Sequence, residues 1–519
     1  MPANTAKTSS GSKTKRRTAK PGEVYAYYIE ALGKYGACQV IDVNQNSILQ
    51  TALDYLEPEP PAEEQIEGLS LYHRQSYRMH HHIVKSWIEN HPVPQDYQFI
   101  GTCALKTDPV CASFSGKWPA GEEYCYEERW KAYDADARAA YKKYINSQDS
   151  VCVHGQIFRK NMGGLTDALY ECLSDTDTLK DFPCITFAQV SGWSKKLERC
   201  LLSAPLLATL RLKRAGVDTL DLSKTHLDHL ELDMAGIRTL ILPPAVRSLV
   251  MYGAVEPSLC IDDHLCSGKI DLSLSLKKAA PLRYGLLHVH IRRLFLKDIS
   301  ELDMEQVIGQ FPETENLHLT GSPGKLTRMQ KIRHLHSLRC LYCTDLFGYG
   351  ASDLEGLKQL SKLRELDFES IPKEAGTYLK KCWKGRLDRL SVTRLRTEDW
   401  LADNLDNPLR HWDDSDFVPP AAYQSAFRCY KDTKKKLLAA SGKEEILKIV
   451  RRYTLHFNRL NDRYEDFIET EEREDIFLAI QYLYETCILH GDCKEAAKPK
   501  AVLTLEELWN AMDEVRGDW

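Results

Sequence analysis

The stretch that decides the fold begins at Leu207, where Leu207-Ala-Thr-Leu-Arg-Leu212 opens a pattern of the form Leu-x-x-Leu-x-Leu. The pattern returns every 9 or 10 residues as far as Met251, and then every 23 to 25 residues between Ile291 and Val392. Its fourth positions are Leu210, Leu220, Leu230, Leu240, Leu249, Leu294, Leu317, Leu341, Leu366 and Leu390. Such a fixed period predicts stacked structural units, each of which buries its leucines against its neighbours.

The pattern and its longer period resemble those of leucine-rich-repeat proteins, and this resemblance implies a solenoid over residues 201–405. One coil of that fold needs about 20 residues, so the decamers before Met251 are expected to be half-coils. In the second half, Met304, Val307 and Phe311 share one helical face with Ile308, which predicts helices alternating with short strands. The predicted fold class is therefore α/β.

The residues on either side of each fourth-position leucine are expected to lie on the outward face of a strand. These positions carry charged, amide and aromatic side chains, a mixture typical of protein recognition. In the decamer half only alternate repeats are expected to share a face, so Arg211 and Glu231 would lie on one side and Asp221 on the other. The candidate partner-binding residues are Arg211, Glu231, Phe295, His318, Tyr342 and Asp367.

Length and composition predict several domains and a protein partner. A chain of 519 residues is too long for one core at roughly 150 residues per domain. Its formal net charge of -5 gives no reason to expect nucleic acid as the main partner. Neither an apolar run of about 18 residues nor a secretory signal is visible, so we expect a cytoplasmic protein without a membrane partner. The oligomeric state is left open.

The solenoid is expected to be one part of a multi-domain chain, with a β-rich domain before it and a helical domain after it. The predicted parts are a disordered basic tail (1–20), a β-rich domain (21–118), a helical connector (119–200), the solenoid (201–405) and a C-terminal helical domain (421–519), with a linker between the last two. In the C-terminal part, helical patterns cover residues 423–440, 444–461 and 471–489. A fourth helix is expected to start at the capping box formed by Thr504 and Glu507.

The N-terminal β-rich domain resembles a small domain of bacterial polymorphic-toxin immunity proteins. The resemblance is carried by Pro21-Gly-Glu-Val-Tyr-Ala26, Gly33-Lys-Tyr-Gly-Ala-Cys-Gln-Val40, Pro92-Val-Pro94 and Tyr97-Gln-Phe-Ile-Gly101. It covers about a hundred residues and has no catalytic signature. It implies an immunity protein (antitoxin) that neutralises a cognate toxin by stoichiometric binding.

Two clusters contain residue types that bind metals, but their spacing does not predict a metal site. Three consecutive imidazoles at residues 80–82 would alternate faces on a strand, and the Cys340-Leu-Tyr-Cys343 motif places one thiol outward and the other inward. Neither set of ligands can converge on one ion without distortion. No catalytic, cofactor-binding or metal-binding residue is therefore predicted.

Two other functions remain open. The stretch Leu242-Pro-Pro-Ala-Val-Arg-Ser-Leu249 resembles short repeats of secreted bacterial effectors that end in a ubiquitin-ligase domain with a catalytic cysteine. In that interpretation, Cys487 or Cys493 would be the nucleophile, although neither has a nearby basic activating pattern. The third possibility is a general scaffold or adaptor. An acidic run at 465–475 offers a further candidate surface, besides its ordinary role at a helix start.

Overall fold

The computed structural model describes residues 17–76, 82–266, 268–276, 290–404, 407–413, 415–489 and 503–519. The chain is mixed α/β, β-rich at its N-terminal end and helical at its C-terminal end. It divides into two compact units, residues 1–393 and 394–519. Among the described helices, every one is too short or too polar to traverse a bilayer.

The N-terminal domain is built on a six-stranded sheet with the order β7-β1-β2-β3-β6-β8. Strands β1, β2 and β3 pair antiparallel in sequence order and form a meander. Only the pairing of β6 with β8 is parallel. The strands are β1 (Glu23–Ile29), β2 (Lys34–Val43), β3 (Ser47–Glu57), β6 (Lys85–Glu89), β7 (Tyr97–Thr102) and β8 (Phe114–Gly116). A short pair, β4 (His73–Arg74) and β5 (His82–Ile83), and the 3-10 helix η1 (Glu63–Gly68) complete this domain.

Helix α1 (Glu122–Ala132) closes the core of the β-rich domain. Its Tyr124 is 1% exposed, and the Tyr124 hydroxyl donates a hydrogen bond of 2.6 Å to the carbonyl oxygen of Leu53 on β3. This buried hydroxyl is therefore satisfied, and its ring fills space between sheet and helix. A second helix, α2 (Ala135–Tyr144), follows directly.

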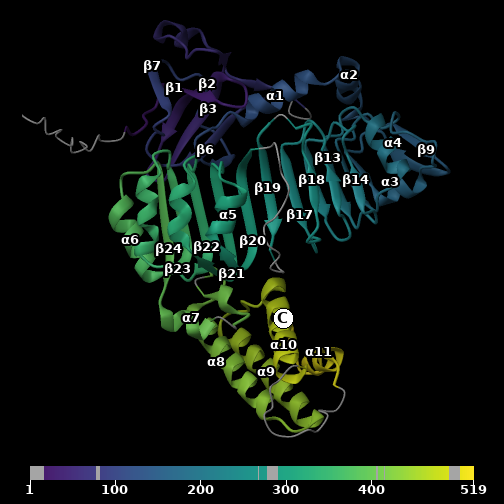
Figure 1. Ribbon diagram of the computed structural model, residues 1–519, viewed down its shortest axis with the longest axis vertical. Coiled ribbons are helices and arrows are strands. Elements are labelled where there is room, and N and C mark those ends of the chain that lie inside the picture. The colour runs from purple at the N-terminus through teal and green to yellow at the C-terminus, as the bar shows by residue number, and fades with distance from the viewer. Residues whose placement is uncertain are drawn as a thin grey trace, which may run out of the picture. The chain divides into compact units, whose positions relative to one another are not determined.

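The main element in the rest of the first unit is a parallel sheet of eleven strands, in the order β11-β12-β13-β15-β17-β19-β20-β21-β22-β23-β24. Figure 1 shows these strands side by side, with the β-rich domain over one end of them. They are β11 (Gly164–Thr166), β12 (Phe187–Ser191), β13 (Thr209–Lys213), β15 (His229–Asp233), β17 (Ser248–Tyr252), β19 (Ile270–Ser275), β20 (Ile291–Asp303), β21 (Asn316–Thr327), β22 (Cys340–Phe347), β23 (Glu365–Pro372) and β24 (Arg389–Arg396).

The leucine pattern sets the register of this sheet. In the second half of the repeat, successive fourth-position leucines pair with each other, as Leu294 does with Leu317 and Leu317 with Leu341. All three side chains are fully buried, whereas the residues beside them are only half-buried. Because side chains alternate along a strand, one apolar row faces the core and the intervening row faces outward.

Consecutive decamers belong to two different sheets. Alternate decamers form β13, β15 and β17 of the large sheet, and the decamers between them form a separate three-stranded parallel sheet. That second sheet consists of β14 (Thr219–Asp221), β16 (Thr239–Ile241) and β18 (Cys260–Asp262). Arg211 therefore pairs with Glu231, whereas Asp221 lies in the other sheet.

The segment 119–200 differs from the predicted helical connector, because it also contains strands. Besides α1, α2, α3 (Asp167–Cys172) and α4 (Lys195–Ser203), it holds the hairpin of β9 (Ser150–Val153) with β10 (Gln156–Arg159), and the first two strands of the large sheet. The alternation that identifies β12 is present in the sequence, since Ala188 and Val190 are buried and Gln189 is exposed. A Cβ at Gly164 would lie 2.2 Å from the Phe187 ring, so a larger residue there would require that ring to move.

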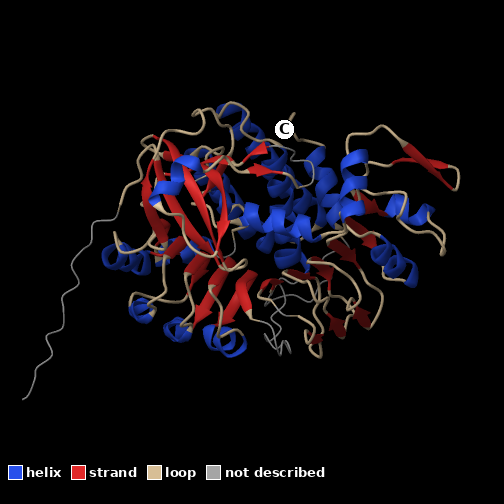
Figure 2. Cartoon of the chain, turned by 90° about the horizontal axis from the view of Figure 1, so that it is seen from above, coloured by secondary structure: helices blue, strands red, loops and turns tan. Residues whose placement is uncertain are grey.

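Helical segments connect the later strands, as the apolar spacing predicts. Met304 and Val307 of α5 (Met304–Gln310) are buried, and so is Phe311 just after it. The other connections are η2 (Met329–His334), η3 (Ser352–Gln359) and α6 (Lys373–Trp383). Seen from above, the strands follow a curve with helices on its outer side (Figure 2). The inner face of the curve is thus the face that carries the outward row of residues.

The second unit is a helical domain that begins earlier than the sequence predicts. Its elements are α7 (Glu398–Asn404), η4 (Arg410–Trp412), α8 (Pro420–Ala439), α9 (Lys443–Arg463), α10 (Thr470–Leu483), the π-helical turn η5 (Tyr484–Leu489) and α11 (Leu505–Asp513). The capping box is present, because Thr504 Oγ1 accepts from the Glu507 amide and Glu507 accepts from the Thr504 amide.

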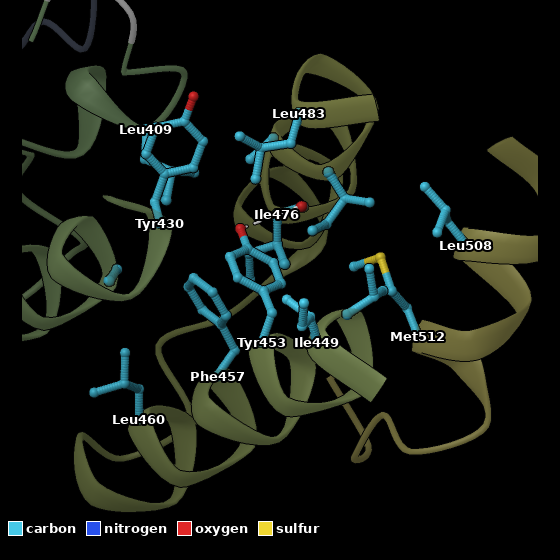
Figure 3. Close-up of a cluster of buried hydrophobic side chains, with 14 of the residues drawn as sticks. Leu409, Tyr430, Ile449, Tyr453, Phe457, Leu460, Ile476, Leu483, Leu508 and Met512 are labelled. Carbon is cyan, nitrogen blue, oxygen red and sulfur yellow. Dashed lines mark hydrogen bonds between the residues drawn. The ribbon is translucent and has the colours of Figure 1, made fainter. Parts of the chain in front are cut away.

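The predicted linker before residue 421 is part of the core of this second unit. Leu409, Trp412 and Val418 are all at most 2% exposed and pack with the apolar faces of α8, α9 and α10. Figure 3 shows Leu409 close to Tyr430 in this cluster. Asn and Pro residues at 406–408 and 419–420 are typical of linkers, but here they flank buried apolar side chains. The helical unit therefore extends from Arg394 to Trp519.

Candidate functional site

A cavity of about 1210 Å³ lies between the β-rich domain and the large sheet, within the first unit. Its floor includes the first residues of several strands, among them Thr209, Ser248, Asn316 and Cys340. Its roof comes from β1, from α1 and from the segment after β8 that contains Trp118. The cavity therefore runs along the amino-terminal ends of the parallel strands.

Three predicted recognition residues form a continuous aromatic stack on the cavity floor. The rings of Phe295 and His318 are 4.2 Å apart and 25° from parallel, and those of His318 and Tyr342 are 4.2 Å apart and 6° from parallel. Adjacent strands hold them in this order, because β20, β21 and β22 pair in register at these positions. Strand spacing of about 4.8 Å brings in-register rings into stacking contact.

Lys117, from the segment after β8, covers one end of this stack. Its Nζ lies 4.9 Å from the centre of the Tyr342 ring, donates to the Tyr342 hydroxyl at 2.6 Å, and forms an ion pair of 3.4 Å with Glu365. The Tyr342 hydroxyl also donates to Glu365. Burial, followed by the nearby Glu365 carboxylate, raises the pKa of the Tyr342 phenol. The phenol therefore remains a hydrogen-bond donor at neutral pH.

Burial keeps the middle ring of the stack uncharged. The pKa of His318 is lowered to about 4, mainly because the imidazole is removed from water, and further because Lys117 and Arg293 are positively charged. A neutral imidazole between two aromatic rings presents an uncharged, planar surface. At neutral pH the stack is thus an uncharged aromatic strip in a cavity that charged side chains also line.

Ion pairs connect the β-rich domain to the strand ends around the cavity. Asp96 pairs with Arg339 at 2.8 Å, Glu30 with Lys269 at 2.6 Å, and Arg129 with Asp228 at 3.2 Å. Most of these side chains are partly exposed, so each pair contributes little, in the range of about 0–1 kcal/mol. These polar contacts thus link the two parts around the hollow.

The remaining candidates lie on the same outward face but are already paired. Arg211 forms an ion pair of 2.9 Å with Glu231, and Asp367 forms one of 3.0 Å with Arg389. Asp367 is next to Tyr342 in the strand register, whereas Arg211 and Glu231 are separated from Phe295 by β17 and β19. The structure thus brings Phe295, His318, Tyr342 and Asp367 together and places Arg211 and Glu231 in a second group.

The expectation of an open strand face needs correction, because the β-rich domain partly covers it. Lys117, Arg247 and Arg364 also line the cavity and were not among the predicted residues. The two arginines lie two residues before fourth-position leucines, in line with the repeat, so the pattern could have identified them. Nothing in the repeat pattern indicates Lys117, which comes from another domain.

The structure describes both cysteines of the Cys340-Leu-Tyr-Cys343 motif but only one of the three consecutive histidines at 80–82. Cys340 is half-buried on the cavity side of β22 and Cys343 is fully buried on the core side, as the alternation predicts. Burial raises the pKa of the Cys340 thiol to about 12, so the thiol stays protonated and is a poor nucleophile at neutral pH. Of the three consecutive histidines, residues 80 and 81 lie outside the described residues.

Comparisons with protein-family models, with curated proteins and with solved structures find no match to this chain. Stacked rings and paired charges recognise a ligand by contact and charge, and the thiol on the cavity floor is protonated. The arrangement is suited to binding.

Folding stability is expected to depend on pH through His318. The unfolded imidazole takes up a proton near its ordinary pKa of 6.5, whereas the folded one resists protonation down to about pH 4. Stability contributed by the neutral ring is therefore full above pH 6.5 and is lost as the pH falls from 6.5 to about 4. Urea unfolding at several pH values should show a smaller fall in the variant His318→Phe, which cannot titrate.

The control is His336→Phe, at an exposed histidine outside the stack. This variant should retain the pH dependence of the unmodified protein. An identical fall in stability in the His318→Phe variant and in the unmodified protein would contradict the assignment.

Proposed function

We propose that this chain is a non-enzymatic protein-binding protein in which the parallel sheet is a leucine-rich-repeat solenoid and the cavity side of that sheet recognises the partner. The observation that carries the proposal is the stack of Phe295, His318 and Tyr342 along the cavity floor, flanked by charged side chains. Interface centres are typically aromatic with a charged rim. The in-register leucines and the two sheets of half-coils support the solenoid.

The partner that we propose is a cognate bacterial toxin, neutralised in the cytoplasm by stoichiometric binding. This step rests on the sequence resemblance of the β-rich domain to polymorphic-toxin immunity proteins. The position of that domain supports it, because residues of the domain and of the solenoid line one cavity. A partner could then contact both parts at once, and stoichiometric occlusion requires such an extensive contact.

The ubiquitin-ligase alternative is less well supported by the second unit. Cys487 is 1% exposed and lies in the π-helical turn η5, where an incoming substrate has no access to its sulfur. A nucleophilic cysteine needs an accessible, activated thiolate. Cys493 lies outside the described residues. Autoubiquitination that is abolished by Cys487→Ala or by Cys493→Ala would support this alternative.

Co-expression with the neighbouring gene tests the proposal. The unmodified protein should form a stable complex with that gene product and restore growth of cells that express it. Tyr342→Ala should weaken the complex by about 2 kcal/mol, because truncating a central aromatic contact removes buried area and stacking. A large secreted repeat protein with a variable C-terminal domain beside this gene would favour immunity over a general scaffold or adaptor.

Phe417→Ala is the matched control, since this aromatic side chain is 82% exposed and lies in the other unit. It should leave binding and growth unchanged. No complex and no rescue with the unmodified protein would exclude the immunity function. A complex that tolerates Ala at Phe295, His318, Tyr342 and Asp367 would instead move the binding surface away from the strand face.

A further inference from the structure

The cavity is long rather than compact. It is lined by residues of ten neighbouring strands, from Phe187 on β12 to Arg389 on β24. At about 4.8 Å between strands, this is on the order of 40 Å along the sheet. A compact small molecule would occupy only part of such a passage, whereas an extended polymer could follow it across the strand ends.

The charges that line the cavity leave cations available. Ten Lys and Arg residues and eight Asp and Glu residues line it. Several of the carboxylates already have partners, for example Asp271 with Arg292 at 2.9 Å and Asp228 with Arg129. In contrast, Arg247 and Arg364 form no ion pair among the described residues, and Arg364 donates only to the carbonyl oxygens of Ser361 and Leu363. Because the ten cations outnumber the eight carboxylates, a surplus of positive charge remains in the cavity.

These two arginines are on opposite sides of the aromatic stack. Arg247 precedes β17 and Arg364 precedes β23, while Phe295, His318 and Tyr342 lie on the three strands β20, β21 and β22 between them. Five inter-strand steps separate the two cations, or roughly 24 Å. An extended peptide rises about 3.3 Å per residue, so this distance corresponds to about seven residues.

Building on the proposed function, we propose that the cavity holds an extended acidic segment of the partner protein, with carboxylates at Arg247 and Arg364 and aromatic side chains over the Phe295–His318–Tyr342 stack. Carboxylates form strong, charge-assisted hydrogen bonds with guanidinium groups. A nucleic acid strand fits less well, because its continuous phosphates would be placed beside eight carboxylates. A polypeptide carries charge only at some of its residues, so its acidic side chains need not lie beside these carboxylates.

The test uses the full chain and a defined peptide probe. The probe has Glu at each end and two Tyr between them, each separated from the next by one Ser, so that all four side chains share one face of an extended chain. Fluorescence anisotropy of the labelled peptide should show saturable binding that weakens with salt. Arg247→Gln and Arg364→Gln should each reduce affinity about tenfold. Ser248→Trp, which fills the cavity floor, should abolish binding.

The controls lie on the other sheet of half-coils. Arg238 precedes Thr239 there as Arg247 precedes Ser248, and Thr219 is an exposed strand residue. Arg238→Gln and Thr219→Trp should bind the peptide like the unmodified protein. A peptide with Lys in place of both Glu, and a single-stranded oligothymidine, should not bind. Equal binding of either comparator, or unchanged affinity in the Arg247 and Arg364 variants, would overturn the proposal.

The peptide-binding test and the co-expression test of the proposed function can fail independently. A partner complex that survives both arginine substitutions and Ser248→Trp would leave protein binding intact and reject the acidic segment. Peptide binding without any complex in the co-expression experiment would instead support the acidic-segment site and reject the proposed toxin partner. Circular dichroism of each variant verifies that the fold is retained.

Discussion

Replacement of Trp412 by alanine is expected to destabilise the C-terminal unit by about 3–5 kcal/mol, the range for removing a large buried aromatic side chain. Trp412 is 2% exposed, and its ring meets Phe457 and Phe467 edge-on at 6.1 and 5.9 Å between centroids. Its indole nitrogen donates to Asp475 at 2.9 Å. The substitution thus leaves a cavity and removes a hydrogen bond to a carboxylate.

Hydrogen exchange measured by mass spectrometry can resolve this effect by segment. Peptides from α9 and α10 should lose protection, while peptides from the large sheet should retain it, because the two units have separate cores. Trp509→Ala, at a tryptophan that is 36% exposed, is the matched control and should have a smaller effect. Undiminished protection in the Trp412→Ala variant would show that the segment before residue 421 is a linker after all.

Replacement of Leu341 by alanine is expected to destabilise the first unit by about 2–5 kcal/mol. Leu341 is fully buried and pairs in register with Leu317 on one side and Leu366 on the other. Because stacked repeats depend on their neighbours, the loss should be shared by adjacent strands. Peptides from β21, β22 and β23 should therefore exchange faster together.

The matched control for this prediction is Leu202→Ala, at a leucine that is 47% exposed on α4. A surface truncation of this kind is expected to change stability by no more than about 0.5 kcal/mol. Equal destabilisation by the Leu341 and Leu202 substitutions would argue that the leucine rows do not form the core of the sheet.

The local pattern was sufficient to predict the register of the sheet. Leucines spaced by two residues alternate with polar side chains, so burial of Leu294, Leu317 and Leu341 forces Phe295, His318 and Tyr342 onto the other face. The 10-residue period likewise predicted that only alternate decamers share a face, and in the structure alternate decamers lie in the same sheet. Both results follow from short-range periodicity, which a single sequence contains in full.

Less could be predicted where the local signal is weak. Strands β11 and β12 are only three and five residues long. They lack the Leu-x-x-Leu-x-Leu spacing of the later strands. They join the sheet because β12 pairs in parallel with the free edge of β13, and β11 pairs in parallel with β12. Residues 407–418 look like a linker by composition, yet Leu409 and Trp412 complete the helical core. In both cases packing against distant residues decides the structure.

The candidate site shows the same division. The sequence by itself determined which side chains share the outward strand face, because strand alternation is a local property of the backbone. Only the tertiary structure decided that the β-rich domain covers this face, that Lys117 caps the stack at Tyr342, and that a long cavity remains between them. Lys117 is 225 residues from Tyr342 in the chain. No periodic pattern encodes such a contact, since it depends on how two separately folded parts meet.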